Sequence, residues 1–261
     1  MHIGLSASIE IEVDETLRQE GIRVTQSLGN AFTNQFDRLI GPDGAIDGTR
    51  LQENWFPQVN AHVFLSHSHA DEATAQVLAG WLFQTFGIST FIDSCIWGYS
   101  NQLLRTIDNK FCLQKNGTYN YVTRNRSTSH VHMMLTSALS KMIDNTECLL
   151  FLNTPNSVIA SQVSDQTYSP WIYFEVVQSG LIRRRTAAAH RQRFIKSFAN
   201  KSMTEDSALA VKYNLNLDHL LEVTFEQFQS WEKAFQSSRN VHPLDVLYGI
   251  LTKGNSHVGR R

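Results

Sequence analysis

The chain lacks the features that define several large classes of protein. Its 261 residues include only three cysteines, an odd number without metal-ligand spacing, so neither a disulfide framework nor a zinc site is expected. No apolar run approaches the ~18 residues that a membrane span needs. The N-terminal stretch MHIGLSASIEIEVDE has no basic region before an apolar run, so no secretory signal is expected. These absences predict a reduced, cytoplasmic protein that makes no membrane contact.

The chain also lacks a strong charge of either sign. Its net charge is −1, and charged residues make up 18%, below the usual ~25%. A dedicated nucleic-acid binder needs a basic surface, so no nucleic-acid partner is expected. The phosphate-binding motifs GxGxxG and GxxxxGK[ST] and the hydrolase motif GxSxG are missing as well. Hydrophobic residues make up 42%, enough for a sizeable core in one domain with extensions.

The stretch 61–93 has the pattern of a βαβ unit. Apolar Val63–Leu65 leads into the polar cluster Ser66–Asp71, and an amphipathic helical segment follows. A second apolar run, Ile88–Ile92, then ends on Asp93. This order predicts two neighbouring parallel strands with polar residues where the first strand stops.

The alternation of strands and helices continues down the chain. Glu147–Leu152 is apolar enough for a buried parallel strand, Ser169 and Pro170 have the chemistry of a helix start, and Thr224–Gln227 is a capping box. Such alternation predicts a parallel sheet covered on both faces, with its ligand site at the carboxyl ends of the strands. Three polar segments are expected to converge there: Ser66–His69, Asp93–Ser100 and Asn153–Ser157.

Residues 1–60 precede this unit and are predicted to form an N-terminal extension. The alternation from Ile9 to Val13 predicts a short edge strand, a helical stripe runs from Val24 to Ile40, and 42–60 have the composition of a linker. An oligomerisation or sensing layer and a structural cap are both compatible with this extension. The predicted division of the chain is an extension (1–60), a main domain (61–240), and a C-terminal helix and tail (241–261).

One pair of residues is a candidate for catalysis. Trp171 and Glu175 are four residues apart and therefore share a helix face. A carboxylate beside aromatic surface is partly desolvated, which raises its pKa and suits it to acid–base or cation-stabilising chemistry. The alternative for Glu175 is an ordinary surface glutamate.

Other candidates carry weaker signals. Trp97, in a glycine-containing loop, has the appearance of an exposed aromatic that stacks on a base, with a buried loop anchor as the alternative. His62, His67 and His69 are close in sequence, but no HExxH or carboxylate cluster completes a metal set. No metal is therefore expected, and hydrogen-bonding histidines are the simpler interpretation.

Four segments in order resemble the Toll/interleukin-1 receptor (TIR) domain. They are VFLSHSHAD with its helix and GISTFID, then ECLLFLNTPNS, SPWIYFE and LLEVTFEQFQSW, together covering about Ala61–Phe235. The resemblance implies a flavodoxin-like three-layer α/β fold with a parallel sheet of about five strands, here with an N-terminal helical extension. The chain departs from the family in a polar insertion within Arg105–Ser129 and a longer stretch at Val158–Tyr168, and its fourth strand is hard to place.

The resemblance implies an enzyme, because Glu175 matches the glutamate with which TIR enzymes cleave NAD⁺. NAD⁺ would be the substrate and no cofactor would be needed. The product would be ADP-ribose, a cyclic isomer or a base-exchanged nucleotide. Trp171 would mainly hold the Glu175 helix against the sheet while bordering the substrate. The full set of implied substrate contacts is Phe64, Ser66, Asp93, Trp97 and Trp171.

The resemblance also implies partners. TIR enzymes often assemble through the BB loop, which follows the second strand, so a homo-oligomer is expected. A bacterial-type TIR enzyme suggests anti-phage defence, in which it depletes NAD⁺ or makes a signal for a separate effector protein. Two alternatives stay open: a non-catalytic TIR adaptor that acts by self-association, and an enzyme like the nucleoside deoxyribosyltransferases, which share the layered fold and a carboxylate directed at a ribose.

Overall fold

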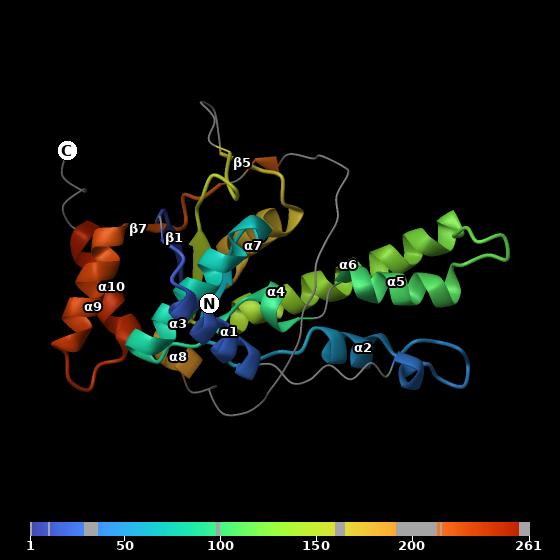
Figure 1. The fold of residues 1–261 in the computed structure, drawn as a ribbon, viewed down its shortest axis with the longest axis horizontal. Coiled ribbons are helices and arrows are strands. Elements are labelled where there is room, and N and C mark those ends of the chain that lie inside the picture. The colour runs from blue at the N-terminus through green and yellow to red at the C-terminus, as the bar shows by residue number, and fades with distance from the viewer. Residues whose placement is uncertain are drawn as a thin grey trace.

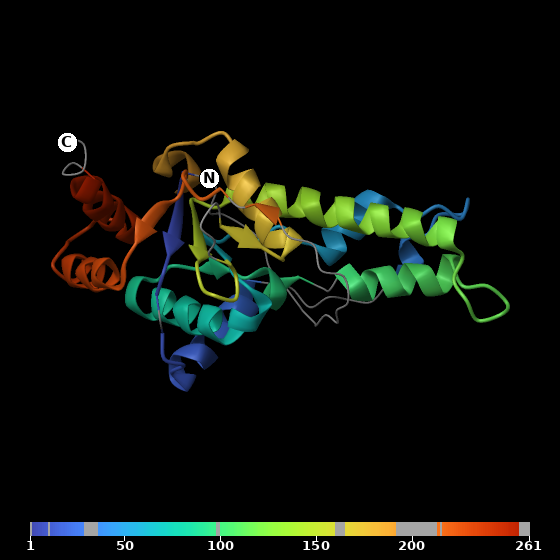
Figure 2. The ribbon, with the colours of Figure 1, turned by 90° about the horizontal axis from the view of Figure 1, so that it is seen from above.

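In the computed structural model, a five-stranded parallel sheet forms the centre of the protein. The described residues are 2–9, 11–28, 36–97, 100–159, 165–191, 213–214 and 216–255. The strands follow the order β3 (Thr90–Phe91), β2 (Val63–Ser66), β4 (Cys148–Leu152), β1 (Ile3–Ala7), β7 (Leu221–Val223). Helices lie on both faces of the sheet (Figures 1 and 2), so the predicted three-layer α/β fold is confirmed.

Each face of the sheet carries its own hydrophobic core. Side chains alternate along β2, so Phe64 joins one core while Val63 and Leu65 join the other. The first core contains residues of α2 (Gly48–Trp55), α5 (Ser100–Phe111), α6 (Tyr121–Asn145) and α7 (Pro170–Leu181). The second contains residues of α3 (Glu72–Phe86), α9 (Phe225–Gln236) and α10 (Pro243–Asn255).

The predicted βαβ unit is present as β2, α3 and β3. The two strands pair in parallel, with Val63 opposite Thr90. Gly87 ends α3 in the left-handed conformation with φ 67°, which a residue without a Cβ adopts at little cost. The predicted strand at 147–152 is also confirmed, since every residue of β4 is buried between β2 and β1.

The predicted edge strand at Ile9–Val13 is wrong. The N-terminal strand is β1, Ile3–Ala7, and it lies between β4 and β7 inside the sheet. Its sequence IGLSA suits this place, because an interior strand of a parallel sheet must be buried on both faces. β1 also fills the position of the fourth strand, which is hard to place from the sequence. The first residues of the chain are therefore part of the main sheet.

The predicted linker at 42–60 is also wrong in part. It contains α2, capped by the Asp47 side chain, which accepts from the N–H of Arg50 at 3.0 Å. Leu51 and Trp55 of α2 are buried in the first core. The helix predicted from Val24 begins earlier, as α1 (Glu15–Leu28), and a short 3₁₀ helix, η1 (Phe36–Leu39), follows; residues 29–35 lie outside the described part.

The polar insertion forms a helical arm. α5 and α6 run side by side away from the sheet and meet at a turn (Figures 1 and 2). The turn contains the pair Asn116-Gly117, which is a turn signal in the sequence, with Gly117 at φ 81°. Buried Asp108 accepts from the Arg124 guanidinium at 3.0 Å and from the Ser127 hydroxyl, which ties the two helices together. The arm is therefore held by its own polar network.

The C-terminal third follows the predicted helix starts. Ser169 caps α7 with Pro170 at the first position, and Thr224 and Gln227 form the predicted capping box of α9. The basic stretch 182–204 has the composition of a helix, and its described part contains α8 (Ala187–Arg191), while 192–204 lie outside the described residues. Three further short elements are η2 (His69–Asp71) and the antiparallel strands β5 (Gln166–Thr167) and β6 (Tyr213–Asn214). Within the described ranges, no helix is both long and apolar enough to cross a membrane.

A buried charged cluster closes the amino end of the sheet. Glu147 is fully buried just before β4, and Arg191 of α8 donates to both of its oxygens at 2.9 and 2.7 Å. Arg191 also pairs with Asp245 of α10, and the Tyr248 hydroxyl donates to Glu147 at 3.0 Å. Burial of a carboxylate is tolerated when it is paired and hydrogen-bonded in this way. The cluster thus joins α8 and α10 to β4.

His62, beside this cluster, predicts a specific loss of stability in acid. Burial, with the positive charges of His242 and Arg191, lowers its pKa from 6.5 to about 4. Between these values the unfolded chain binds a proton that the folded chain does not, so stability is full above pH 6.5 and falls as the pH drops to 4. The His62 contribution to this loss is about 3 kcal/mol. Urea unfolding of wild type and His62→Gln is measured across this pH range. The free energy of unfolding should fall less steeply with decreasing pH in the variant than in wild type. Exposed His130→Gln is the control and should show the pH dependence of wild type. An equal pH dependence of stability in His62→Gln and wild type would contradict the prediction.

Candidate functional site

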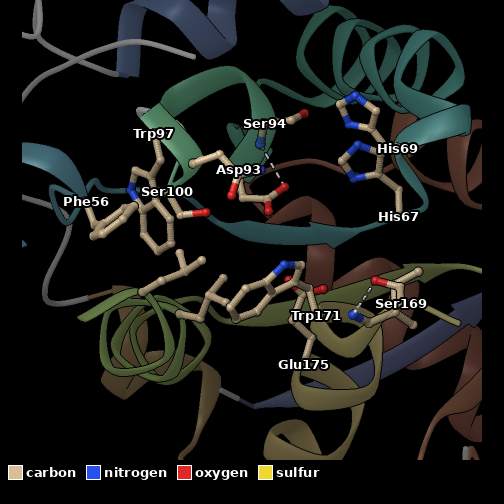
Figure 3. A pocket seen from close by; sticks show the side chains of 14 residues that line it. Phe56, His67, His69, Asp93, Ser94, Trp97, Ser100, Ser169, Trp171 and Glu175 are labelled. Carbon is tan, nitrogen blue, oxygen red and sulfur yellow. Dashed lines mark hydrogen bonds between the residues drawn. The ribbon is translucent and has the colours of Figure 1, made fainter. Parts of the chain in front are cut away.

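A cavity opens at the carboxyl ends of β2 and β3, where the sequence predicts the ligand site. The side chains around it come from segments far apart in the chain (Figure 3). The lining residues are Phe56, His67, His69, Asp93, Ser94, Trp97, Ser100, Asn101, Leu135, Leu139, Ser169, Trp171, Ile172 and Glu175. Two of the three predicted polar segments, those after β2 and β3, therefore converge here.

Glu175 lies in the second turn of α7 and is 4% exposed, so it is not an ordinary surface glutamate. Its Oε2 accepts a hydrogen bond of 2.6 Å from the Ser66 hydroxyl, at the end of β2. The Ser169 side chain fixes the start of α7 by accepting from the N–H of Ile172 at 3.2 Å. The helix cap and the strand end together determine where the carboxylate sits.

The surroundings of Glu175 disfavour its charged form. Burial raises the pKa of Glu175 well above its usual value, and the negative charge of Asp93 raises it further. The hydrogen bond from Ser66 acts in the opposite direction. Asp93 also faces this cavity, and no basic side chain is among the interactions that shift the pKa of Glu175. The site therefore favours a cationic ligand, because a nearby positive charge would stabilise the ionised form of Glu175.

Asp93 sits at the start of the short helix α4 (Asp93–Ile96), and one residue, Ile92, separates it from β3. Its Oδ1 accepts from the N–H of Ser94 at 2.8 Å, and its carboxylate faces the cavity (Figure 3). The βαβ pattern predicted the end of the strand at this residue. The structure brings Asp93 and Ser66, 27 residues apart in sequence, to the same edge as Glu175.

Trp97 lines the cavity, but the expectation that it is exposed is wrong. The side chain is 3% exposed, and its ring packs edge-on against Phe56 and Phe91 at centroid distances of 5.6 and 4.9 Å. Its indole N–H donates to the carbonyl of Pro57 at 2.8 Å. Trp97 is thus the loop anchor that the sequence left as the alternative, and it forms an apolar wall of the cavity.

The other predicted contacts have different positions. Trp171 lines the cavity and meets His132 of α6 edge-on at 5.6 Å, so it holds α7 against α6. Phe64 is 1% exposed and packs on Phe91; among the described residues it is part of the core and not of the cavity lining. Ser66 reaches the site only through its hydrogen bond to Glu175.

The third polar segment, Asn153–Ser157, supports the loop after β2, whose histidines line the cavity. Buried Asp71 accepts from the Thr154 hydroxyl at 2.5 Å and from the Asn156 side-chain amide at 2.7 Å. These bonds connect the loop after β4 to the loop after β2. Pairing across two loops in this way has no local signal in the sequence.

Sequence reasoning missed several residues of the site. Phe56 comes from the segment predicted as a linker, and Leu135 and Leu139 come from the arm helix α6. The sequence signal available for Phe56 was the apolar cluster Trp55-Phe56-Pro57. The leucines show only helical periodicity, which gives no indication of what the helix covers.

The site consists of two carboxyl groups, two imidazoles, hydroxyls and an apolar wall. No group of three or more metal-ligating side chains occurs within the described ranges. Comparison of the chain with protein-family models, characterised proteins and solved structures finds no significant match. The function is therefore inferred from the geometry of the site and from the motif resemblance.

Proposed function

We propose that the protein cleaves the bond between nicotinamide and ribose in NAD⁺. The observation that carries this proposal is the buried carboxyl of Glu175, which is held by Ser66 and faces a cavity that Asp93 also lines. The TIR-like motifs supply the choice of substrate, since Glu175 occupies the position of the family's glutamate. The nicotinamide riboside part of NAD⁺ carries a positive charge that complements two carboxylates.

The chemistry needs a stabilised cation and little acid catalysis. The bond from the ribose C1′ to the pyridinium nitrogen breaks, its electron pair leaves with nicotinamide, and the leaving group becomes neutral. The ribose then resembles an oxocarbenium ion, which a carboxylate stabilises electrostatically. Addition of water to C1′ gives ADP-ribose and releases one proton; attack by an atom of the same nucleotide would give a cyclic product. Glu175 acts in this scheme as the charge-stabilising group.

The Ser66 hydrogen bond should set the pH at which nicotinamide release is lost on the acid side of the pH–rate profile. Activity requires ionised Glu175, whose pKa is raised, so the rate of nicotinamide release should fall with decreasing pH at a midpoint above 4.5. The Ser66 hydrogen bond lowers this pKa, so Ser66→Ala should move the midpoint to higher pH. The measurement is the rate against pH, with Ser129→Ala, whose hydroxyl bonds within α6, as the control. A shift to lower pH would contradict this role of Ser66.

The direct test is incubation of the purified chain with NAD⁺ while nicotinamide release is followed. Family TIR enzymes often need assembly, so the assay includes a high protein concentration and added partner proteins. Separation of the products by chromatography then identifies ADP-ribose, a cyclic isomer or a base-exchanged nucleotide. Absence of release under every one of these conditions would refute cleavage and favour the adaptor, while transfer between deoxynucleosides would favour the deoxyribosyltransferase-like enzyme.

The biological role proposed with this activity is anti-phage defence. Cleavage would either deplete NAD⁺ or produce a nucleotide signal for a separate effector, in a homo-oligomer assembled through the loop after β3. A carboxyl that is buried beside a second acid costs stability, and an adaptor that acts by self-association has no need for it. This cost supports the enzyme over the adaptor.

A further inference from the structure

His67 has an unusual position in the cavity. Both ring nitrogens are buried, and neither has a hydrogen-bond partner within the described part of the chain. An unpaired buried polar group destabilises the fold, because it has lost its hydrogen bonds to water and gained none within the protein. Of the described buried polar atoms without partners, only those of His67 belong to a residue that lines the cavity. A ligand in the cavity would supply the hydrogen-bond partner that the His67 ring lacks.

The cavity has three chemically distinct parts. Figure 3 shows the aromatic rings of Phe56 and Trp97 on one side, Asp93 with Glu175 in the middle, and the imidazoles on the other side. A ligand that reaches from the carboxyl groups to the imidazoles therefore meets groups that suit a positive charge at one end and groups that suit a negative charge at the other. A neutral imidazole donates one hydrogen bond, and a protonated one donates two.

The lining contains no lysine or arginine among the described residues. Any anionic part of a ligand must therefore be met by the two imidazoles or by hydroxyls and amides. His69 is half exposed and lies 4.0 Å from the Glu72 carboxylate, so a partner is already present. His67 has no such partner, which makes it the nitrogen donor that is free for an anion.

We propose that His67 forms a phosphate subsite, which makes the cavity specific for nucleotides with a diphosphate over nucleosides. This inference rests on the proposed function, because it assigns the diphosphate of the dinucleotide to the imidazole side while the cationic nicotinamide riboside faces Glu175. It also separates the two enzyme classes, since a nucleoside carries no phosphate for His67 to bind.

The experiment measures binding to the full chain by calorimetry, with ADP-ribose and adenosine as probes. Wild type should bind ADP-ribose more tightly than adenosine. His67→Phe, which keeps the ring size without hydrogen bonding, should weaken ADP-ribose binding by at least about ten-fold and leave adenosine unchanged. His67→Gln, which retains a donor, should lose less. Exposed His130→Phe on α6 is the matched control and should bind both probes as wild type does.

Spectroscopy of the unchanged protein gives a test that does not depend on a variant folding. The side-chain ¹⁵N resonances of His67 should shift on addition of ADP-ribose and stay in place with adenosine. Equal ADP-ribose affinity in wild type and His67→Phe, or an equal loss for both probes, would overturn the subsite. A protein that binds ADP-ribose through His67 but never releases nicotinamide would keep the subsite and refute the cleavage, so the two proposals fail separately.

Discussion

Glu175→Gln is expected to abolish nicotinamide release and, at the same time, to stabilise the folded protein at pH 7. Loss of the carboxylate removes the charge that stabilises the ribose cation, and loss of one such group costs at least about 10²-fold in rate. The amide keeps the shape of the side chain and an oxygen that accepts from the Ser66 hydroxyl. The stability gain is expected because the ionised acid is poorly solvated where it lies.

The direction of the stability effect follows from the raised pKa of Glu175. In the folded state the carboxyl holds its proton at a pH where the unfolded chain has already lost it. The stability associated with the protonated form is present below the unfolded pKa of 4.5 and is lost as the pH rises through the folded pKa. At pH 7 Glu175 therefore opposes folding, and its replacement by an amide should contribute about 0.5–2 kcal/mol.

Urea unfolding at pH 7 and pH 4 measures the effect. The stabilisation by Glu175→Gln should be clear at pH 7 and smaller at pH 4, where the folded wild type is protonated. Exposed Glu53→Gln on α2 is the control, with no expected gain at either pH. A variant that is inactive but no more stable than wild type at pH 7 would show that Glu175 is stabilised as an anion, contrary to its burial beside Asp93.

Gly21→Ala is expected to disrupt the packing of α1 on α3. A Cβ at Gly21 would lie 1.8 Å from the carbonyl oxygen of Gln76, and a Cβ at Gly80 would lie 1.9 Å from that of Leu17. These obstacles are backbone atoms, which cannot rotate away as a side chain can. The helices would have to separate, with a loss of about 3 kcal/mol or more in the free energy of unfolding.

The same change should also weaken the site. α1 packs on α4, the helix that begins at Asp93, so displacement of α1 shifts a carboxylate of the cavity. Gly249→Ala in α10 is the matched control, because nothing lies within 4 Å of its Cβ position and alanine is the better helix former by roughly 1 kcal/mol. Unfolding of both variants in urea gives the comparison. Equal stability of Gly21→Ala and wild type would contradict the close crossing.

Local chemistry in the sequence predicts several elements correctly. The strand at 147–152 and the caps at Ser169 and Thr224 all depend on side chains within a few residues of one another. The pairing of Trp171 with Glu175 on one helix face is local in the same sense. Patterns with a period of 2 or 3.6 record which face of an element is buried, so they also predict the layered parallel fold.

Other features required the tertiary structure. β1 lies inside the sheet because IGLSA is buried on both faces, whereas the described residues of the stronger alternation, Ile9 and 11–13, belong to no strand. Trp97 is buried because Phe56 and Pro57, some 40 residues earlier, cover it. The sequence by itself determined the layered fold, the strand at 147–152, the caps at Ser169 and Thr224, and that Glu175 is a candidate acid. Strand order, the burial of Glu175 with its hydrogen bond from Ser66, the charge of Asp93 near it, and the unpaired ring of His67 were decided only by tertiary contacts. Burial and charge proximity depend on residues distant in the chain.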